Sequence, residues 1–174
     1  GEKAIYDNPW INITEYDVIN PSGGKGIYGK VHFKNKAIGV IALDQEQNIW
    51  LVGQYRFVLN EYSWEIPEGG CPDGEDYLTA AKRELLEETG LVAQNWRQLM
   101  KMHLSNSVTD ELAIVFLATQ LEQKNASPEE TEQLIVKRVP FPKVVKMVDE
   151  GEITDAISVA AIQKVQLLKV SNTL

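Results

Sequence analysis

Cysteine and long apolar runs are scarce in this sequence. Its 174 residues contain one cysteine, Cys71, which excludes an intramolecular disulfide framework and suits a reducing compartment. No apolar run approaches the roughly 20 residues that a membrane-spanning helix needs. Residues 1–8 also lack the basic and then apolar layout of a signal peptide. We therefore expect a soluble cytoplasmic protein.

Positive charge is also in short supply. The chain has 17 Lys and Arg residues against 25 Asp and Glu residues, for a formal net charge of -8. Nucleic acids and anionic membrane surfaces are normally bound by clustered Lys and Arg, so we expect neither as a partner. Small phosphorylated ligands are not excluded, because a few basic groups and a divalent metal can bind them. The length corresponds to one domain, and a hydrophobic content of 44% excludes a disordered chain.

Alternating and apolar runs predict a β-rich core. Residues 10–20 alternate well enough to be a strand, and the Pro and Gly residues at 21–26 predict a turn after it. Three further runs predict a meander of three strands, followed later by two more strands, a polar loop and a last strand. In chain order, the meander is 28–33, 37–43 and 49–58, the two strands are 96–104 and 112–121, the loop is 122–131 and the last strand is 132–139.

Three helices are predicted among these strands. The first, at 76–89, begins with Asp76, which can serve as its N-cap, and ends before Gly90. Two amphipathic stretches near the C-terminus, at 144–150 and 155–170, predict the others. A mixed sheet with one helix in mid-chain and two at the end predicts an α+β fold rather than an alternating βαβ fold.

Four carboxylates lie in or just before the first predicted helix: Glu75, Glu84, Glu87 and Glu88. The last three are spaced by three and four residues, so they share one helix face, with the outer two about 6 Å apart along the axis. Like charges near the negative end of the helix dipole destabilise the helix. A solvated acidic face is the usual explanation of such a pattern. A bound cation is the alternative, and ligands that are all oxygen suit Mg²⁺ or Mn²⁺.

Residues 69–91 resemble the Nudix box at every defined position. The matching residues are Gly69, then after five residues Glu75, and after seven more Arg83-Glu84-Leu85-Leu86-Glu87-Glu88-Thr89-Gly90-Leu91. The flanking segments WEIPEGG and HLSNSVTDE are similar to the ADP-ribose and nucleoside diphosphate sugar pyrophosphatase branch of that family. The resemblance implies a single Nudix domain over 1–174, with an α+β fold that is a three-layer α/β/α sandwich around a mixed sheet.

The resemblance also implies a site for Mg²⁺ or Mn²⁺. Arg83 would hold a box carboxylate in place, since it lies one helical turn before Glu87. Glu75 would brace the loop and the helix. The implied metal ligands are the side chains of Glu84, Glu87 and Glu88 and the main-chain carbonyl of Glu68.

A general base is implied outside the box. Carboxylates bound to a metal are poor bases, because the cation depresses their proton affinity. In the resembling branch the base is a glutamate on the loop after the penultimate core strand. Glu132 matches that position best, and Glu130 is the close alternative. An acidic loop that merely keeps the protein soluble is the competing interpretation.

Substrate contacts are implied on three segments. Arg56 matches a family arginine that binds substrate phosphate, although a salt bridge to Glu65 would explain it nearly as well. Tyr28 would help to hold a nucleotide, or would only pack on the strand surface. Ser107 and Glu111 lie in the segment similar to the substrate loop of the branch.

The implied reaction is metal-dependent hydrolysis of the diphosphate bond of ADP-ribose or a similar nucleoside diphosphate sugar, giving a nucleoside monophosphate and a sugar phosphate. A hydrolase that sanitises nucleoside triphosphates and a non-catalytic sensor of nucleotide sugars with the Nudix fold are the alternatives. The branch also implies a homodimer in which the N-terminal strand region, 1–35, reaches across a two-fold interface. The other interpretation is that Trp10 in this region covers its own sheet.

Overall fold

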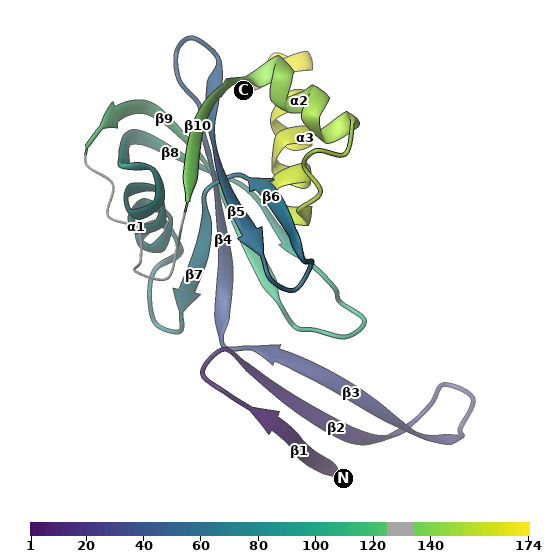
Figure 1. The fold of residues 1–174 in the computed structure, drawn as a ribbon. Coiled ribbons are helices and arrows are strands. Elements are labelled where there is room, and N and C mark those ends of the chain that lie inside the picture. The colour runs from purple at the N-terminus through teal and green to yellow at the C-terminus, as the bar shows by residue number, and fades with distance from the viewer. Residues whose placement is uncertain (125–133) are drawn as a thin grey trace.

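A computed structural model describes residues 1–124 and 134–174. The first three strands, β1 (Glu2–Asp7), β2 (Ile11–Ile19) and β3 (Lys25–Phe33), form an antiparallel sheet in the order β1-β2-β3. We call it the N-terminal sheet. It extends away from the rest of the molecule, and β3 continues directly into the core (Figure 1). Apolar side chains on it are therefore open to solvent, among them Ile27, which is 67% exposed.

Two further sheets and three helices form the core. The larger sheet has the order β7-β4-β9-β8 and is mixed, because β4 and β9 are parallel whereas the other pairs are antiparallel. The smaller sheet, β10-β5-β6, is antiparallel. The strands are β4 (Asn35–Ala42), β5 (Asn48–Arg56), β6 (Glu61–Glu65), β7 (Glu68–Pro72), β8 (Leu91–His103), β9 (Leu112–Gln123) and β10 (Ile135–Pro140), and the helices are α1 (Tyr77–Thr89), α2 (Phe141–Asp149) and α3 (Ala156–Val170).

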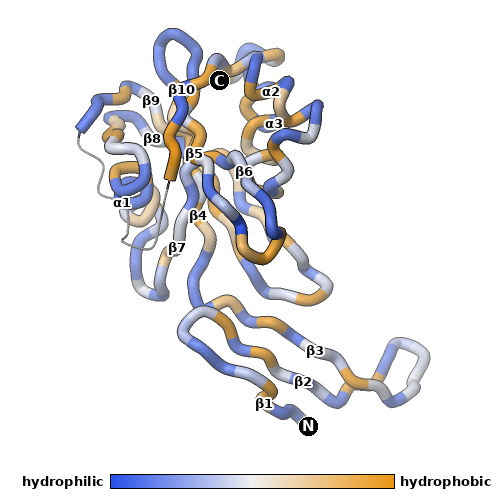
Figure 2. Tube along the Cα trace, viewed as in Figure 1, coloured by the Kyte–Doolittle hydropathy of each residue, from blue (hydrophilic) through white to orange (hydrophobic). Residues whose placement is uncertain are grey.

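Helices cover both faces of the central strands, which explains why β4 and β9 are almost continuously apolar. Successive side chains of a strand point to opposite faces. In β4, Ile38 and Val40 pack in the cluster that contains Leu85 of α1, whereas Ile41 packs in the cluster that contains α2 and α3 residues. Helix α1 lies on one side of the sheets and α2 and α3 lie on the other (Figure 1), with apolar strand segments between them (Figure 2). The predicted α+β fold with a mixed sheet between helical layers is confirmed.

The predicted meander of three strands is wrong. β3 pairs with β2, β4 pairs with β7 and β9, and β5 pairs with β6 and β10, so the three runs belong to three different sheets. Within the described residues, β4 and β5 do not form a ladder. The segments are joined by an isolated bridge between Leu43, directly after β4, and Ile49 of β5. An apolar run indicates a strand but not its neighbour. β4 lies beside β9 with helices on both faces, as is typical of a buried parallel pair, and this long-range burial is not visible in a local pattern.

Strands β1, β6 and β7 were not predicted. All residues of β1 are exposed, so it has no buried alternation to detect. β7 has the sequence EGGCP, and Gly and Pro are depleted in strands. The helices agree better with the prediction, although α2 begins at Phe141 because Pro142 is tolerated in a first turn. No helix in the described parts of the chain is both long and apolar enough to cross a membrane.

Candidate active site

Helix α1 carries the acidic segment and has a defined residue at each end. Asp76 is the N-cap, and its carboxylate accepts a hydrogen bond from the backbone N–H of Thr79 at 3.0 Å. Gly90 ends the helix with φ 71°, a left-handed conformation in which a Cβ atom would be strained. Three small or apolar residues bury the face of α1 that packs on the larger sheet: Ala80, Ala81 and Leu85. The two cap residues and the buried face therefore set the start, the end and the orientation of α1, and with them the turns on which the glutamates lie.

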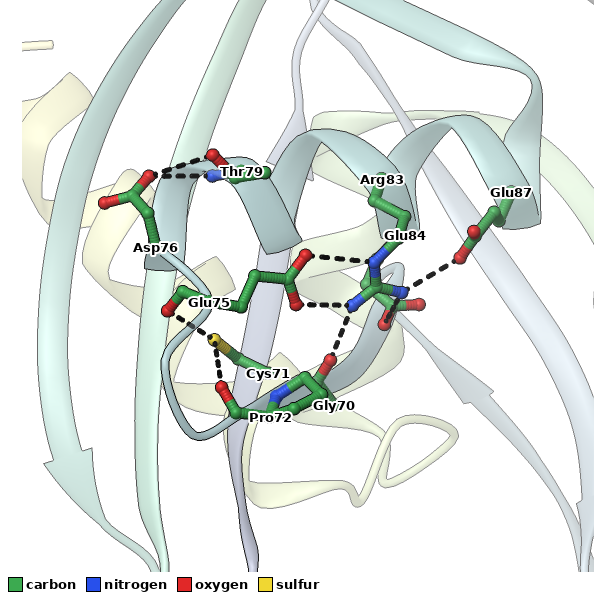
Figure 3. A network of polar contacts seen from close by, with 9 residues as sticks. All are labelled: Gly70, Cys71, Pro72, Glu75, Asp76, Thr79, Arg83, Glu84 and Glu87. Carbon is green, nitrogen blue, oxygen red and sulfur yellow. Dashed lines mark hydrogen bonds and ion pairs between the residues drawn. The ribbon is translucent and has the colours of Figure 1, made fainter.

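Arg83 is the centre of a network that joins α1 to β7 (Figure 3). Its guanidinium donates to both carboxylate oxygens of Glu75, at 3.2 and 3.0 Å, and to the carbonyl of Gly70 at 2.8 Å. It also donates to Glu84 at 2.7 Å and to Glu87 at 3.1 Å. The paired Glu75, followed by Glu84 and Glu87, raises the pKa of Arg83, so the group stays charged. The contact expected between Arg83 and Glu87 is present, and Glu75 braces the loop through the same guanidinium.

Glu84 lies directly against the backbone of Gly69. A Cβ atom built on Gly69 would come within 2.0 Å of the Glu84 carboxyl carbon, far closer than two non-bonded carbons can approach. The first glycine of the box therefore serves a different purpose from Gly90. It leaves the space that the Glu84 carboxylate occupies.

Glu88 is the most deeply placed of the box acids, with 4% of its surface exposed. One of its carboxylate oxygens accepts the backbone N–H of Glu68 at 3.0 Å. The side chain of Glu68 in turn accepts the hydroxyl of Ser158 at 2.8 Å. Burial, followed by the neighbouring carboxylate of Asp155, raises the pKa of Glu68 well above its ordinary value. The start of β7 thus connects the end of α1 with the start of α3.

The oxygen donors at this site fit a hard divalent cation such as Mg²⁺ or Mn²⁺. The side chains that would hold it are Glu84, Glu87 and Glu88, together with the Glu68 carbonyl. In the described part of the chain, no three His, Cys, Asp or Glu side chains are gathered closely enough to form a metal site as they stand. The reason is visible in the contacts, since Arg83 binds Glu84 and Glu87 while Glu88 faces the Glu68 amide.

A cavity of about 640 Å³ opens beside these acids. Its wall includes Glu84 and Arg83 from α1, the glycines of β7, and Trp10 from the turn between β1 and β2. Ligand cavities commonly measure about 300 to 1,000 Å³. The N-terminal region therefore contributes an aromatic side chain to the same cavity as the box of its own chain.

Comparison with known proteins identifies the family. Residues 33–161 match the family described as the NUDIX domain. The chain belongs to the Nudix family. It is 32% identical over 169 residues to an ADP-ribose pyrophosphatase of Bacillus subtilis, covering 96% of this chain and 91% of that protein. It is 31% identical over 150 residues to an ADP-ribose pyrophosphatase of Mycobacterium tuberculosis, covering 84% and 72%.

A solved structure supports the fold independently. The crystal structure of an ADP compounds hydrolase superposes with a TM-score of 0.88 and covers 100% of this chain and 95% of that chain. The sequence identity is 20%, so this likeness concerns the Nudix fold alone. The resemblance read from the box is therefore confirmed at the level of the family and the fold.

Arg56 of this Nudix domain lies at the end of β5 and pairs with Glu65 on β6. Its Nε donates to one Glu65 oxygen at 2.9 Å and its Nη2 donates to the other, a bidentate pair. Glu65 is 3% exposed, whereas the Arg56 side chain is 41% exposed. The salt bridge considered from the sequence is thus present. A phosphate contact through the exposed part of the guanidinium stays a prediction.

The segment after β8 docks on β3 and brings two of the predicted substrate residues together. The hydroxyl of Tyr28 donates to the carbonyl of Ser107. Backbone hydrogen bonds join Val31 to Val108 at 2.9 Å and to Asp110 at 3.2 Å. Tyr28 is 49% exposed, so the contact leaves much of its ring open. The N-terminal sheet and the proposed substrate loop therefore form one continuous surface.

Glu111, at the end of that segment, is half-buried rather than fully exposed to solvent. Burial, followed by the negative charge of Asp155, raises its pKa above the ordinary value for Glu. Asp155 and Ser158 were not predicted as site residues. Ser and Asp at a helix start normally indicate only a cap, and Asp155 does cap α3 by accepting the N–H of Ser158 at 2.7 Å.

The two candidates for the general base, Glu130 and Glu132, lie outside the described residues. Arg83 and the box acids converge on one site with Gly69 and Glu68, whereas Arg56 pairs with Glu65 on the smaller sheet. Tyr28 and Ser107 meet on the N-terminal sheet.

Proposed function

We propose that this Nudix protein hydrolyses the diphosphate bond of ADP-ribose or a similar nucleoside diphosphate sugar, with Mg²⁺ or Mn²⁺ as its cofactor. The observation that carries the proposal is the cavity of about 640 Å³ that Glu84, Arg83 and Trp10 help to line. Its acidic side chains suit a divalent cation that would in turn bind a diphosphate, and its aromatic side chain suits a base or sugar face. The two relatives named ADP-ribose pyrophosphatase favour the same substrate class.

In the proposed reaction, water attacks one phosphorus atom and the P–O–P bridge breaks, which releases a nucleoside monophosphate and a sugar phosphate. Glu84, Glu87, Glu88 and the Glu68 carbonyl would hold a divalent cation. When bound, it would lower the pKa of the attacking water and neutralise charge on the phosphate oxygens. Arg83 orients Glu84 and Glu87 and does not itself react.

We assign the remaining roles to residues outside the box. Arg56 binds phosphate through the part of its guanidinium that Glu65 leaves open. Tyr28, Ser107 and Glu111 bind the nucleotide or the sugar. Glu132, or Glu130 as the alternative, takes the proton from the attacking water. Replacing each of these two by Gln tests the assignment. Loss of the base should lower kcat by about 10² to 10⁴, while substrate binding changes only a few-fold.

We also propose that the protein acts as a homodimer in the cytoplasm. The N-terminal region, 1–35, would carry the two-fold interface. The single buried cysteine, Cys71, is compatible with a reducing compartment. Neither nucleic acid nor membrane is proposed as a partner, given the net charge of -8.

The test is a substrate panel assayed for released phosphate esters. ADP-ribose, GDP-mannose, UDP-glucose and nucleoside triphosphates are each incubated with Mg²⁺, with Mn²⁺ and after EDTA treatment. We expect turnover of a nucleoside diphosphate sugar that needs metal, and a loss of at least ~10³ in kcat for Glu88→Gln. Preference for triphosphates would favour the sanitising hydrolase, and tight binding without turnover would favour the sensor. Full activity after EDTA would contradict metal dependence.

A further inference from the structure

The connection between β6 and β7 is held by three hydrogen bonds from three different elements. The N–H of Ile66 donates to the hydroxyl of Ser158 on α3 at 2.9 Å. The carbonyl of Pro67 accepts the N–H of Val40 on β4 at 2.9 Å. The N–H of Glu68 donates to the Glu88 carboxylate on α1 at 3.0 Å. Pro67 has no N–H of its own, so the position of this connection depends on the groups on either side of it.

Ser158 makes two of the contacts that define this connection. Its side chain is 0% exposed, and its hydroxyl both accepts from Ile66 and donates to the Glu68 carboxylate, at 2.9 and 2.8 Å. A hydroxyl has one proton to donate, so this donor is fully used. The backbone N–H of Ser158 is held by the N-cap Asp155, which fixes the residue in the first turn of α3. Ser158 therefore forms hydrogen bonds with the residue before Pro67 and with the residue after it.

We propose that Ser158 is a positioning residue for Glu88. By fixing Ile66 and the Glu68 side chain, it sets the direction of the Glu68 N–H, which in turn holds the Glu88 carboxylate. This inference rests on the proposed function, in which Glu88 and the Glu68 carbonyl bind the metal. Groups that orient metal ligands from behind typically change metal affinity about 10- to 100-fold when they are removed.

A purely structural role for Ser158 would give different measurements. Loss of a buried hydrogen bond lowers the free energy of unfolding wherever it occurs. It does not by itself change the affinity of a folded protein for a cation, and it speeds amide exchange throughout the core rather than at the Glu68 amide in particular. Metal affinity and amide exchange at Glu68 therefore separate positioning from general stability.

The experiment compares Ser158→Ala with wild-type protein and with Ser171→Ala. Ser171 is the C-cap of the same helix, and its exposed hydroxyl donates to the carbonyl of Leu167 at 2.9 Å, so this variant controls for the loss of a serine hydroxyl from α3 outside the contacts to the β6–β7 connection. Free Mn²⁺ is measured by electron paramagnetic resonance during titration, and amide hydrogen exchange is followed by NMR. We expect Ser158→Ala to weaken Mn²⁺ binding about 10-fold and to speed exchange of the Glu68 amide, with Ser171→Ala unchanged.

The outcomes distinguish this inference from the function on which it rests. Wild-type protein that does not bind Mn²⁺ would contradict the proposed metal site, and the role of Ser158 with it. Wild-type affinity in Ser158→Ala, with only a lowered melting temperature, would overturn the role of Ser158 alone. Ser158→Cys replaces the hydroxyl by a somewhat larger thiol that is only a weak donor and acceptor, so it carries the same test if the alanine variant does not fold.

Discussion

No residue larger than glycine fits at position 69 while Glu84 keeps its place, because a Cβ atom there would lie 2.0 Å from the Glu84 carboxyl carbon. We expect Gly69→Ala to displace Glu84 and to lower Mn²⁺ affinity and kcat about 10- to 100-fold, the range typical of a disturbed metal site. Titration with Mn²⁺ and steady-state kinetics measure the two effects.

Gly29→Ala is the matched control for that variant. Gly29 also lies in a strand, but a Cβ atom there would meet nothing within 4 Å. It should therefore keep wild-type metal affinity. Normal turnover in Gly69→Ala would mean that Glu84 can leave its present place without cost.

Glu111 provides a pH-dependent test at the scale of one residue. Burial and the charge of Asp155 raise its pKa in the folded state. Such a group binds its proton more tightly when folded, so it makes the protein less stable as the pH rises from the ordinary Glu pKa, about 4.3, through the folded value. Glu111→Gln removes this cost. We expect a higher melting temperature than wild type at neutral pH and a difference that disappears as the pH falls below about 4, where Glu becomes protonated in both states.

Glu2→Gln is the control for the Glu111 experiment, because it makes the same change of charge at an exposed position on β1. A Glu111→Gln variant whose melting curve follows wild type at every pH would contradict the environment described for Glu111. The same variant also tests substrate binding, since a role for Glu111 there would raise KM for the nucleotide sugar.

At the scale of elements, α1 depends on its N-cap. Asp76→Ala removes the acceptor for the Thr79 N–H. Loss of an N-cap costs roughly 1 kcal/mol of unfolding free energy. That loss corresponds to a fall of about 2 to 4 °C in melting temperature for a domain of this size. Urea and thermal unfolding, followed by circular dichroism, measure it.

Asp73→Ala is the control in the same loop. The Asp73 side chain is 78% exposed and pairs with Lys36 at 3.1 Å on the surface, where ion pairs contribute little. It should unfold like wild type. Equal stability of Asp76→Ala and Asp73→Ala would show that packing of α1 on the sheet, rather than the cap, decides where the helix begins.

At the scale of the whole molecule, exposed apolar side chains favour the proposed dimer. They gather on the N-terminal sheet and at the turn between β5 and β6, where Phe57 and Val58 are 88% and 91% exposed. Exposed apolar side chains that gather in this way often mark an interaction site. Light scattering at low micromolar concentration should therefore give twice the 19.5 kDa of one chain.

A pair of substitutions locates the interface. Ile27→Asp on β3 should shift the measured mass toward one chain, because an isologous interface repeats the added charge on both partners. Leu167→Asp is the matched control, since Leu167 on α3 is 66% exposed and Ile27 is 67% exposed. A mass near 19.5 kDa for wild-type protein would contradict the dimer.

Much of the box could be predicted because its signals are local. Asp76 and Gly90 are cap residues whose effects reach only one turn, and both occupy the predicted positions. The contact between Arg83 and Glu87 follows from helical spacing alone, and it is present at 3.1 Å. Sequence reasoning failed where the partner was distant, as with β4 beside β9, or where a strand lacked an alternating pattern, as with β7.

The sequence by itself determined the Nudix box, the ends of α1 and the runs that become the central strands, because each depends on residues within a few positions of one another. Only the tertiary structure decided that Ser158 reaches Glu68, that Trp10 shares a cavity with Glu84, and that the N-terminal sheet holds the segment around Ser107. These contacts join residues 74 to 90 positions apart. Burial and hydrogen-bond satisfaction of the whole chain select them, and no local pattern in the sequence records that selection.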